Sequence, residues 1–424
     1  MTSSQPPIHW RRYALVATLS LALLTIAAAV TRVWVLTAIP VGFLFGFFLQ
    51  KGALCGAAAL SEVVVFRDRE KVAGLWIAIA VSMVGFAGIE ATGWVQLAPK
   101  PLIWMSALVG GVVFGVGTVL AGGCISGCLF KAAEGNLNSM AGLGGIALGI
   151  GIVETGPLHG LHVAMMANVV KTAGGKPVTL ASLTGLPYWT LALLVGGATL
   201  AVASWLRRRR RQPHRPQPDA VPTPWLTRSW KPWQAGLAIG LLAVPAYLSS
   251  AATGRNYPLG VTHGVLQTYQ LLTETHVKHV WRAPAAPSAA PVASSAKAVP
   301  SLVPPLPVPP PPPAPPAKVI NWWLVLVVLS LPLGSWASAR MSGAVKLLPR
   351  PPEQTVIAFF GGVLVGIGAA FATGCIVGNI LSGWALMSVG MLIFGVATAL
   401  GNWAATYIYL VGWSPFKSQG DAAA

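Results

Sequence analysis

Residues Gly110 to Gly127 read GGVVFGVGTVLAGGCISG, and residues Gly361 to Gly378 read GGVLVGIGAAFATGCIVG. Ten of the 18 aligned positions are identical, and Cys124 falls on Cys375. Self-similarity of this kind indicates a fold that is built from internal repeats. The sequence therefore predicts two related halves, each of which carries a Gly-Cys motif behind an apolar, glycine-rich segment.

The chain around these motifs is strongly apolar. Of its 424 residues, 54% are hydrophobic and 9% are charged, against about 25% charged residues in an ordinary soluble domain. A helix needs about 20 apolar residues to cross a bilayer. We therefore predict an all-α, polytopic integral membrane protein, with about nine to ten transmembrane helices in two pseudo-symmetric halves and with short re-entrant helices or loops. The expected spans are Tyr13–Val30, Val33–Leu49, Val72–Leu97, Leu102–Gly122, Leu186–Leu206, Trp233–Ser249, Val319–Ala339 and the double-length block Thr355–Tyr409.

The relative orientation of the two repeats stays open at this point. A shorter Gly-rich run, Met140–Val153, is either a further span or a re-entrant piece. A simple count gives both repeats the same orientation. An inverted arrangement requires one intervening segment to be re-entrant, with Leu158–Val170 and Leu259–Leu272 as the candidates.

The net charge of +18 has a topological explanation. In a soluble protein this charge would favour a nucleic-acid partner. Here the basic residues cluster at the ends of apolar runs, which is the positive-inside bias of membrane proteins, and such loops face anionic lipid. We expect the lipid bilayer and no nucleic acid as a partner. The residues expected in the cytoplasm are Arg11, Arg12, the Arg67–Lys71 cluster, Arg207–Arg211, Arg340, Lys346 and Arg350.

A low-complexity segment divides the chain. Residues 283–318 consist largely of proline and alanine, and this composition favours an extended or disordered linker. The predicted organisation is an N-terminal extension with the first membrane helix (1–32), a first membrane repeat (33–206), a basic connector with further helices (207–282), the Pro/Ala-rich linker (283–318), a second membrane repeat (319–414) and a C-terminal tail (415–424).

The glycines of the repeat have two explanations. At helical spacing, small residues let membrane helices pack closely. Gly123 and Gly374, which directly precede Cys124 and Cys375, also lower the helix propensity at that point. A break there would free backbone N–H groups and would aim the positive N-terminus of the next helix, starting near Ile125, at the thiol. Non-helical backbone at membrane depth occurs where it is buried in protein or lines a cavity.

The cysteines allow several chemistries. Zinc usually takes four Cys or His ligands, often as CxxC pairs, whereas Cys124 and Cys128 have CxxxC spacing; we expect no metal and no cofactor. A disulfide between these two would have poor geometry, while one from Cys55 to Cys124 or Cys375 stays open. A buried free cysteine is often a small hydrophobe. Packing alone explains Cys124 and Cys375 poorly, because they occupy matched positions of the repeat. For Cys128, which aligns with Asn379 in the other copy, packing and the lining of a path both stay open.

A fourth symmetric thiol is missing from the pattern. The segment Ala53–Ala57 around Cys55 has a plausible counterpart in Arg340–Ala344, which makes Ser342 the expected position of that thiol. Thiols are weak donors and soft partners, and a permeation path needs sites that bind and also release. Several thiols along a path would suit a soft anion that contains sulfur, and the scarcity of carboxylates in the spans fits an anionic substrate.

Three segments carry a resemblance to a known family. They are FGFFLQKGALCGAA (Phe45–Ala58), GTVLAGGCISGC (Gly117–Cys128) and GAAFATGCIVGNILSG (Gly368–Gly383). They resemble the YeeE/YedE family of sulfur-compound transporters, whose best understood members take up thiosulfate. The likeness covers the chain from about residue 33 to residue 413, apart from the Pro-rich linker and the Arg-rich connector.

The resemblance implies a fold and a mechanism. It implies an all-helical inner-membrane protein in which short helices and loops reach from both faces to a constriction with cysteines. Thiosulfate would pass along these cysteines by transient hydrogen bonds. Cys55, Cys124 and Cys375 match the motif positions and take this role, while Cys128 lies at a more variable position. The family often works beside TusA-like sulfur carriers in the cytoplasm, which would be a partner.

We therefore predict a transporter and not an enzyme: uptake of thiosulfate or a related sulfur anion across a bacterial inner membrane. The alternatives are another anion, such as a selenium compound or sulfite, or a membrane thiol oxidoreductase that uses Cys124 and Cys128. The predicted substrate-binding residues are Cys55, Cys124, Cys375, Cys128, Gly123, Gly374, Ser126 and Asn379.

Overall fold

The computed structural model describes residues 10–172, 174–209, 224–274, 277–281, 318–345, 347 and 351–411. The predictions for the Pro/Ala-rich linker (283–317) and the C-terminal tail lie outside these residues, as do those for Arg210, Arg211, Lys346 and Arg350. Within the described residues, ten helical segments have the length and apolar composition needed to cross a membrane. The prediction of an all-α, polytopic membrane protein is confirmed.

The elements follow one another as helices with one short pair of strands. In chain order they are α1 (Trp10–Thr31), η1 (Trp34–Thr37), α2 (Ala38–Lys51), α3 (Gly56–Val65), α4 (Glu70–Ala91), α5 (Trp104–Leu120), α6 (Ile125–Ala133), α7 (Leu137–Glu154), α8 (His159–Met166), α9 (Leu180–Thr184), α10 (Tyr188–Arg209), α11 (Pro232–Ala252), α12 (Thr262–Thr273), β1 (Val277–Val280), β2 (Lys318–Asn321), α13 (Trp322–Ser342), α14 (Pro352–Phe371), the π-helical η2 (Ile376–Ser382), α15 (Gly383–Ala385) and α16 (Val389–Val411). The strands β1 and β2 pair in parallel.

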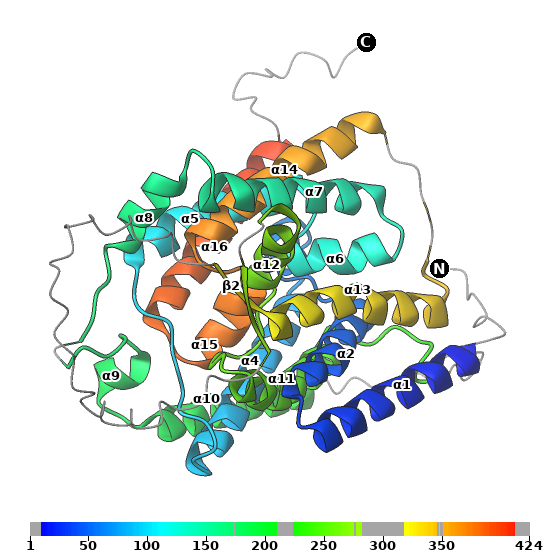
Figure 1. Ribbon diagram of the computed structural model, residues 1–424, viewed down its shortest axis with the longest axis horizontal. Helices are drawn as coiled ribbons and strands as arrows, with labels where there is room; N and C mark the ends of the chain where they lie inside the picture. The colour runs from blue at the N-terminus through cyan, green and yellow to red at the C-terminus, as the bar shows by residue number, and fades with distance from the viewer. Residues whose placement is uncertain are drawn as a thin grey trace, which may run out of the picture.

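We name the two ends of the bundle by their charge. The end that carries the Arg67–Lys71 turn, Arg208 and Arg340 has the most basic loops. The positive-inside bias assigns such an end to the cytoplasm, and we call it the inner end. In Figure 1 the inner end lies on the right, where α1 begins and α13 ends, and α8 and α9 lie on the left at the outer end.

The two repeats are inverted. A Cβ on Gly110, near the start of α5, would lie 2.6 Å from the backbone nitrogen of Ala372, just past the end of α14. A Cβ on Gly117, further along α5, would lie 2.6 Å from the nitrogen of Val365, further back along α14. The helices are therefore antiparallel, and the expectation of equal orientation is wrong. The reason is that α7, which contains the Gly-rich run, is a full span, so that α14 is the fifth span after α5.

Close helix packing explains most glycines of the repeat. Gly111 and Gly115 bring α5 against the backbone of α16, and Gly362 and Gly366 bring α14 against the backbone of α7. Since these glycines are repeat-matched, the same interface is built twice. Figure 1 shows α14 beside α7, and α13 beside α2. Outside this centre, α4 packs along α11.

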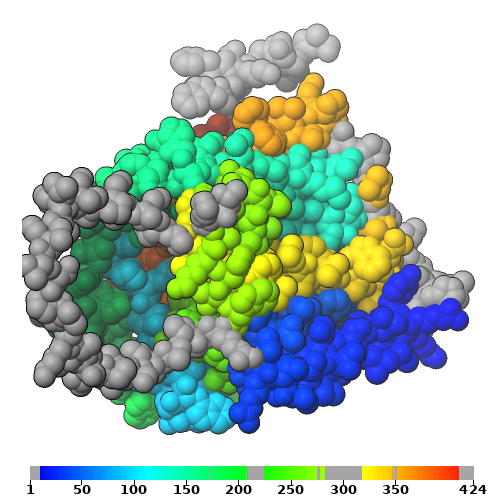
Figure 2. All heavy atoms as spheres, in the orientation of Figure 1, coloured from blue at the N-terminus to red at the C-terminus, as the bar shows by residue number. Residues whose placement is uncertain are grey.

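Short helices fill the centre between the spans. The helix α6 lies between α5 and α7 in the chain and packs against α7 and α13. The segment η2–α15 lies between α14 and α16 and packs against α4 and α16. Figure 2 shows α12 on the near face, between α7 and α13, both of which it contacts.

Candidate functional site

Each of three cysteines is the N-cap of a short helix. Cys55 precedes α3, Cys124 precedes α6 and Cys375 precedes η2, and all three have extended backbone. The residue two positions earlier is left-handed in every case, with φ of 45° at Ala53, 68° at Gly122 and 52° at Thr373. The predicted helix break before Cys124 and its copy at Cys375 is confirmed, because this left-handed residue ends one helix and lets the chain turn back.

The three helix starts meet in the interior. A Cβ on Gly127 of α6 would lie 2.5 Å from Cys55 Sγ and 3.5 Å from Cys124 Sγ, and the two thiols interact with each other. A Cβ on Gly56 of α3 would lie 2.5 Å from Ile376 Cγ2, directly after Cys375. All four thiols of the chain are free and buried. The cysteines that the sequence singled out are thus brought together around the first turns of three helices.

A loop without cysteine takes the fourth position around the point where the three helix starts meet. The prediction that Ser342 occupies this position is wrong. Ser342 lies in the last turn of α13 and donates to the carbonyl of Ser338 at 3.0 Å. In the first copy, Gly127 contacts Cys55. In the second copy, the matched residue Gly378 lies beside Gly260, and a Cβ on Gly378 would be 4.0 Å from Gly260 Cα. The loop between α11 and α12 therefore takes the place of the missing thiol. Sequence comparison missed it because this loop shares no residue pattern with the Cys55 segment.

Cys128 and Asn379 make equivalent contacts. The Cys128 thiol donates to the carbonyls of Ala121 at 4.0 Å and Gly123 at 3.7 Å. Asn379 Nδ2 donates to the repeat-matched carbonyls of Ala372 at 3.0 Å and Gly374 at 3.1 Å. Each side chain thus stabilises the turn that precedes the short helix of its own copy, residues 121–124 or 372–375, which we call the Gly-Cys turn. This contact accounts for a sulfur in one copy and an amide in the other.

Three other predicted residues surround the thiols. Ser126 is buried, and its hydroxyl lies 3.4 Å from Cys124 Sγ. A Cβ on Gly123 would lie 3.6 Å from Cys128 Sγ, and a Cβ on Gly374 would lie 3.0 Å from Lys100 Nζ. The space beside Gly374 is used by a cation that the sequence interpretation did not include.

Two cations face a cavity on the outer side of Cys375. The cavity has a volume of about 400 Å³, and its lining includes Lys100, Arg255, Tyr257, His263 and Thr373. A neighbouring cavity of about 260 Å³ also reaches Lys100, His263 and Thr373. No carboxylate lines either cavity among the described residues. An anion is therefore the ligand that this charge distribution favours.

Neutral groups hold both cations in place. Lys100 Nζ donates to the Thr373 carbonyl at 2.6 Å and to Asn379 Oδ1 at 2.8 Å. The Arg255 guanidinium donates to the carbonyls of Tyr257 at 2.8 Å and Pro258 at 2.6 Å. Because these acceptors carry no net charge, the positive charge of the two side chains is oriented but not neutralised.

Burial sets the protonation of the outer cavity. It lowers the pKa of Lys100 to about 7, and the positive charge of the nearby Arg255 contributes to this lowering. Burial lowers the pKa of Arg255 to about 10 and that of His263 to about 3, and it raises the pKa of Tyr257. At neutral pH, Arg255 is charged, His263 and Tyr257 are neutral, and Lys100 titrates.

A third cavity lies on the inner side of the cysteines. It has a volume of about 290 Å³ between α3, α5 and α16 and includes Ala57, Ser61, Thr118 and Gly122 in its lining. Ala57 follows Cys55 by two positions, and Gly122 precedes Cys124 by two. The buried thiols thus lie between an outer, cationic cavity and an inner cavity whose lining includes hydroxyl groups and the carboxylate of Glu62.

Comparisons with known proteins identify the family of this chain. A family model described as sulphur transport matches residues 51–404, which include all four cysteines and both Gly-Cys motifs. The chain belongs to the sulphur transport family. The resemblance to YeeE/YedE proteins is confirmed, and as a member of a transport family the chain is a multi-pass membrane protein.

Two relatives within the sulphur transport family match along nearly the whole chain. One is the thiosulfate transporter TsuA of Spirochaeta thermophila, with 28% identity over 88% of this chain and 98% of the relative. The other is the thiosulfate transporter TsuA of Escherichia coli, with 25% identity over 89% of this chain and 95% of the relative. The probable transporter YedE of Escherichia coli is 31% identical over 24% of this chain and 25% of its own length.

Sequence reasoning missed Lys100 and Arg255. The available signal was a single basic residue next to Pro101 in one case and Gly254 in the other, within otherwise uncharged loops. Neither loop belongs to the repeated Gly-Cys segment on which the prediction of the site residues is based.

Proposed function

We propose that this protein carries thiosulfate inward across a bacterial inner membrane, by transient hydrogen bonds to the thiols of Cys55, Cys124 and Cys375. The observation that supports this most is the position of the buried thiols between a cationic outer cavity and an inner cavity. The two relatives named thiosulfate transporters, which align over most of the chain, favour the same cargo.

The outer cavity would collect the anion. Lys100 and Arg255 attract it, and the absence of a carboxylate among the described lining residues leaves that attraction uncompensated. Lys100 reaches the Cys375 turn through the Thr373 carbonyl and interacts electrostatically with Cys375. An anion held by Lys100 is therefore at the start of the thiol series.

The thiols would pass the anion on without holding it. A thiol is a weak hydrogen-bond donor, and the first N–H groups of α3, α6 and η2 have no partner within their own helix. Such donors stabilise a negative charge at a helix start but release it more readily than a cation would. A path of this kind satisfies the need for sites that are easy to enter and to leave. A TusA-like carrier at the inner end stays a prediction of the family resemblance.

The substitutions Cys124→Ala and Cys375→Ala test the proposal. In cells without other thiosulfate uptake, each should lower growth on thiosulfate and the initial rate of radiolabelled uptake by about tenfold or more, since ~1.4 kcal/mol of lost interaction has that effect. Ser342→Ala is the matched control and should leave uptake unchanged, because the Ser342 hydroxyl is bonded to a carbonyl of its own helix, α13. Membrane levels of each variant are measured by immunoblot.

Normal uptake by both cysteine variants would refute the thiol path. Competition by unlabelled sulfite or selenium oxyanions that exceeds competition by thiosulfate would assign another cargo to the same path. A disulfide that appears and disappears during turnover, detected by differential thiol labelling, would favour an oxidoreductase instead.

A further inference from the structure

The two Gly-Cys turns are each bound by a lysine. Lys131 Nζ donates to the carbonyl of Gly122 at 2.6 Å, and Lys100 Nζ donates to the carbonyl of Thr373 at 2.6 Å. Gly122 and Thr373 occupy the same position of the repeat, two residues before the cysteine, and both are left-handed. The same carbonyl is therefore bound by an ammonium group at the inner and at the outer end.

The two lysines come from unrelated parts of the repeat. Lys131 belongs to α6, directly after the inner turn, and its position in the second copy is Ser382. Lys100 belongs to the loop between α4 and α5. Shared ancestry of the two halves does not produce a contact between non-equivalent residues. The recurrence of an ammonium group at this carbonyl points to a requirement of the turn itself.

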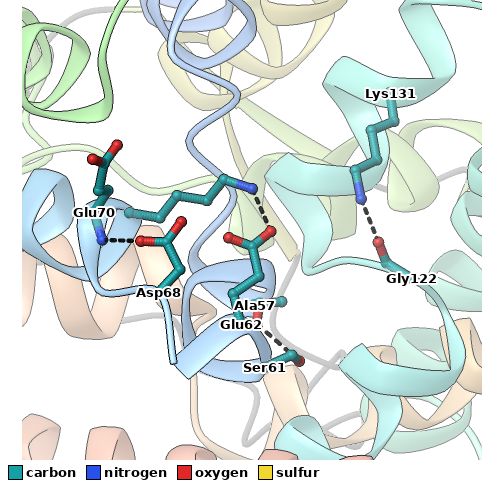
Figure 3. Close-up of polar contacts among 8 residues, drawn as sticks. Ala57, Ser61, Glu62, Asp68, Glu70, Gly122 and Lys131 are labelled. Carbon is teal, nitrogen blue, oxygen red and sulfur yellow. Dashed lines mark hydrogen bonds and ion pairs between the residues drawn. The ribbon is translucent and has the colours of Figure 1, made fainter. Parts of the chain in front are cut away.

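Lys131 is bonded to a residue that lines the inner cavity. Gly122 lines that cavity together with Ser61 and Glu62 of α3. Figure 3 shows Lys131 directed at Gly122 on one side of the view and Glu62 on the other. The charge of Lys131 acts on Cys55, so the inner cation is coupled to the thiols as the outer one is coupled to Cys375.

The nearby carboxylates have other partners. Glu62 forms an ion pair with Lys71, and Glu134 accepts a hydrogen bond from Gln50 at 3.0 Å. Glu134 interacts electrostatically with Lys131, but within the part of the chain that is described the ion pairs are Lys71–Glu62 and Lys318–Glu274. Lys131 thus donates to the neutral Gly122 carbonyl and is in no ion pair among the described residues, so that its positive charge is not neutralised.

We propose that Lys131 is the inner counterpart of Lys100: it binds the Gly122 carbonyl and receives the anion in the inner cavity after it leaves Cys55 and Cys124. This inference rests on the proposed function. Without the ammonium group, the carbonyl oxygen would present its partial negative charge to the anion. Lys131 is half-buried, so that solvent screens its charge. It holds the anion weakly, which is the property that an exit site needs.

Transport measured separately from each side tests the inference. Right-side-out membrane vesicles present the outer cavity to radiolabelled thiosulfate, and inside-out vesicles present the inner cavity. Lys131→Gln should raise KM in inside-out vesicles about fivefold, the effect of losing one partly screened charge, and should leave KM in right-side-out vesicles unchanged. Lys131→Arg should restore the wild-type value, because arginine keeps both the charge and the donor groups.

Two controls separate charge at this site from charge in general. Lys231→Gln removes an exposed cation of the same inner end and should change neither KM. Raising the ionic strength should raise the inner KM of the wild type more than that of Lys131→Gln, since only the wild type has the charge to be screened.

Equal KM values for Lys131→Gln and wild type in inside-out vesicles would overturn the inference, as would an equal loss from both sides that Lys131→Arg does not restore. Wild-type vesicles that take up no thiosulfate from either side would instead refute the proposed function.

Discussion

At the scale of single residues, the site depends on backbone conformation as much as on sulfur. A left-handed residue, one intervening residue and a cysteine N-cap recur before α3, α6 and η2. At Thr373 the left-handed conformation costs about 1 kcal/mol relative to glycine, and Lys100 binds the carbonyl of this residue. Cysteine supplies the thiol, while the turn decides where the thiol points.

The equivalence of Cys128 and Asn379 gives a prediction at this scale. Cys128→Asn should keep thiosulfate uptake within about twofold of the wild type, because asparagine makes the same bonds to the turn in the other copy, at ~1 kcal/mol each. Cys128→Ala should lower the melting temperature of the purified protein, because it leaves the turn carbonyls without their donor. Uptake assays and thermal unfolding in detergent measure the two effects. A loss of uptake in Cys128→Asn as deep as in Cys124→Ala would show that the Cys128 thiol contacts the anion.

At the scale of helices, glycine positions fix the crossing of α5 and α14. Sequence comparison could predict that these glycines are equivalent, because the repeat matches Gly117 with Gly368. It could not predict that the two helices lie antiparallel against each other, because the direction of α14 depends on whether Met140–Val153 crosses the membrane. That run has 14 residues, five of them glycines, which is shorter than the about 20 apolar residues of a typical span. Its apolar length alone was therefore ambiguous.

A single methyl group tests this interface. A Cβ on Gly368 would lie 2.7 Å from both the Gly110 carbonyl oxygen and Phe114 Cα. Gly368→Ala should therefore force α5 and α14 apart and destabilise the protein by about 1–3 kcal/mol, which lowers its melting temperature in detergent. Gly197→Ala in α10 is the control, because a Cβ there meets nothing within 4 Å. Equal melting temperatures for the two variants would contradict the close approach of these helices.

At the scale of the whole molecule, the inverted halves produce a path with unlike ends. The Gly-Cys motifs and their duplication were readable from the sequence, because both copies keep the Gly-Cys-Ile tripeptide. The cations were not, because Lys100, Lys131 and Arg255 reach the site from segments that differ between the halves. The misassignment of Ser342 has the same cause: contacts across the pseudo-symmetric centre, and not sequence likeness, identify the Gly260 loop as the occupant of the fourth position.

The presence of Lys100 in the outer cavity predicts that the KM for thiosulfate depends on external pH. In the outer cavity, Lys100 has a pKa of about 7, while the pKa of Arg255 is about 10 and that of His263 about 3. Lys100 is therefore the group there that loses its charge as pH rises through neutrality. Since an anion binds the protonated form more tightly, KM in right-side-out vesicles should rise between pH 6 and pH 8.5, by at most about tenfold per pH unit above the pKa.

The substitution Lys100→Arg separates this effect from a general effect of pH. Arginine stays protonated throughout the range, so the KM of the variant should stay level where that of the wild type rises. The internal pH should have little influence on the outer KM, because the titrating group faces the outer cavity. A wild-type KM that is constant over this range, or a rise of equal size in Lys100→Arg, would mean that Lys100 does not bind the anion. The attraction at the outer end would then rest on Arg255, which stays charged at every pH in the experiment.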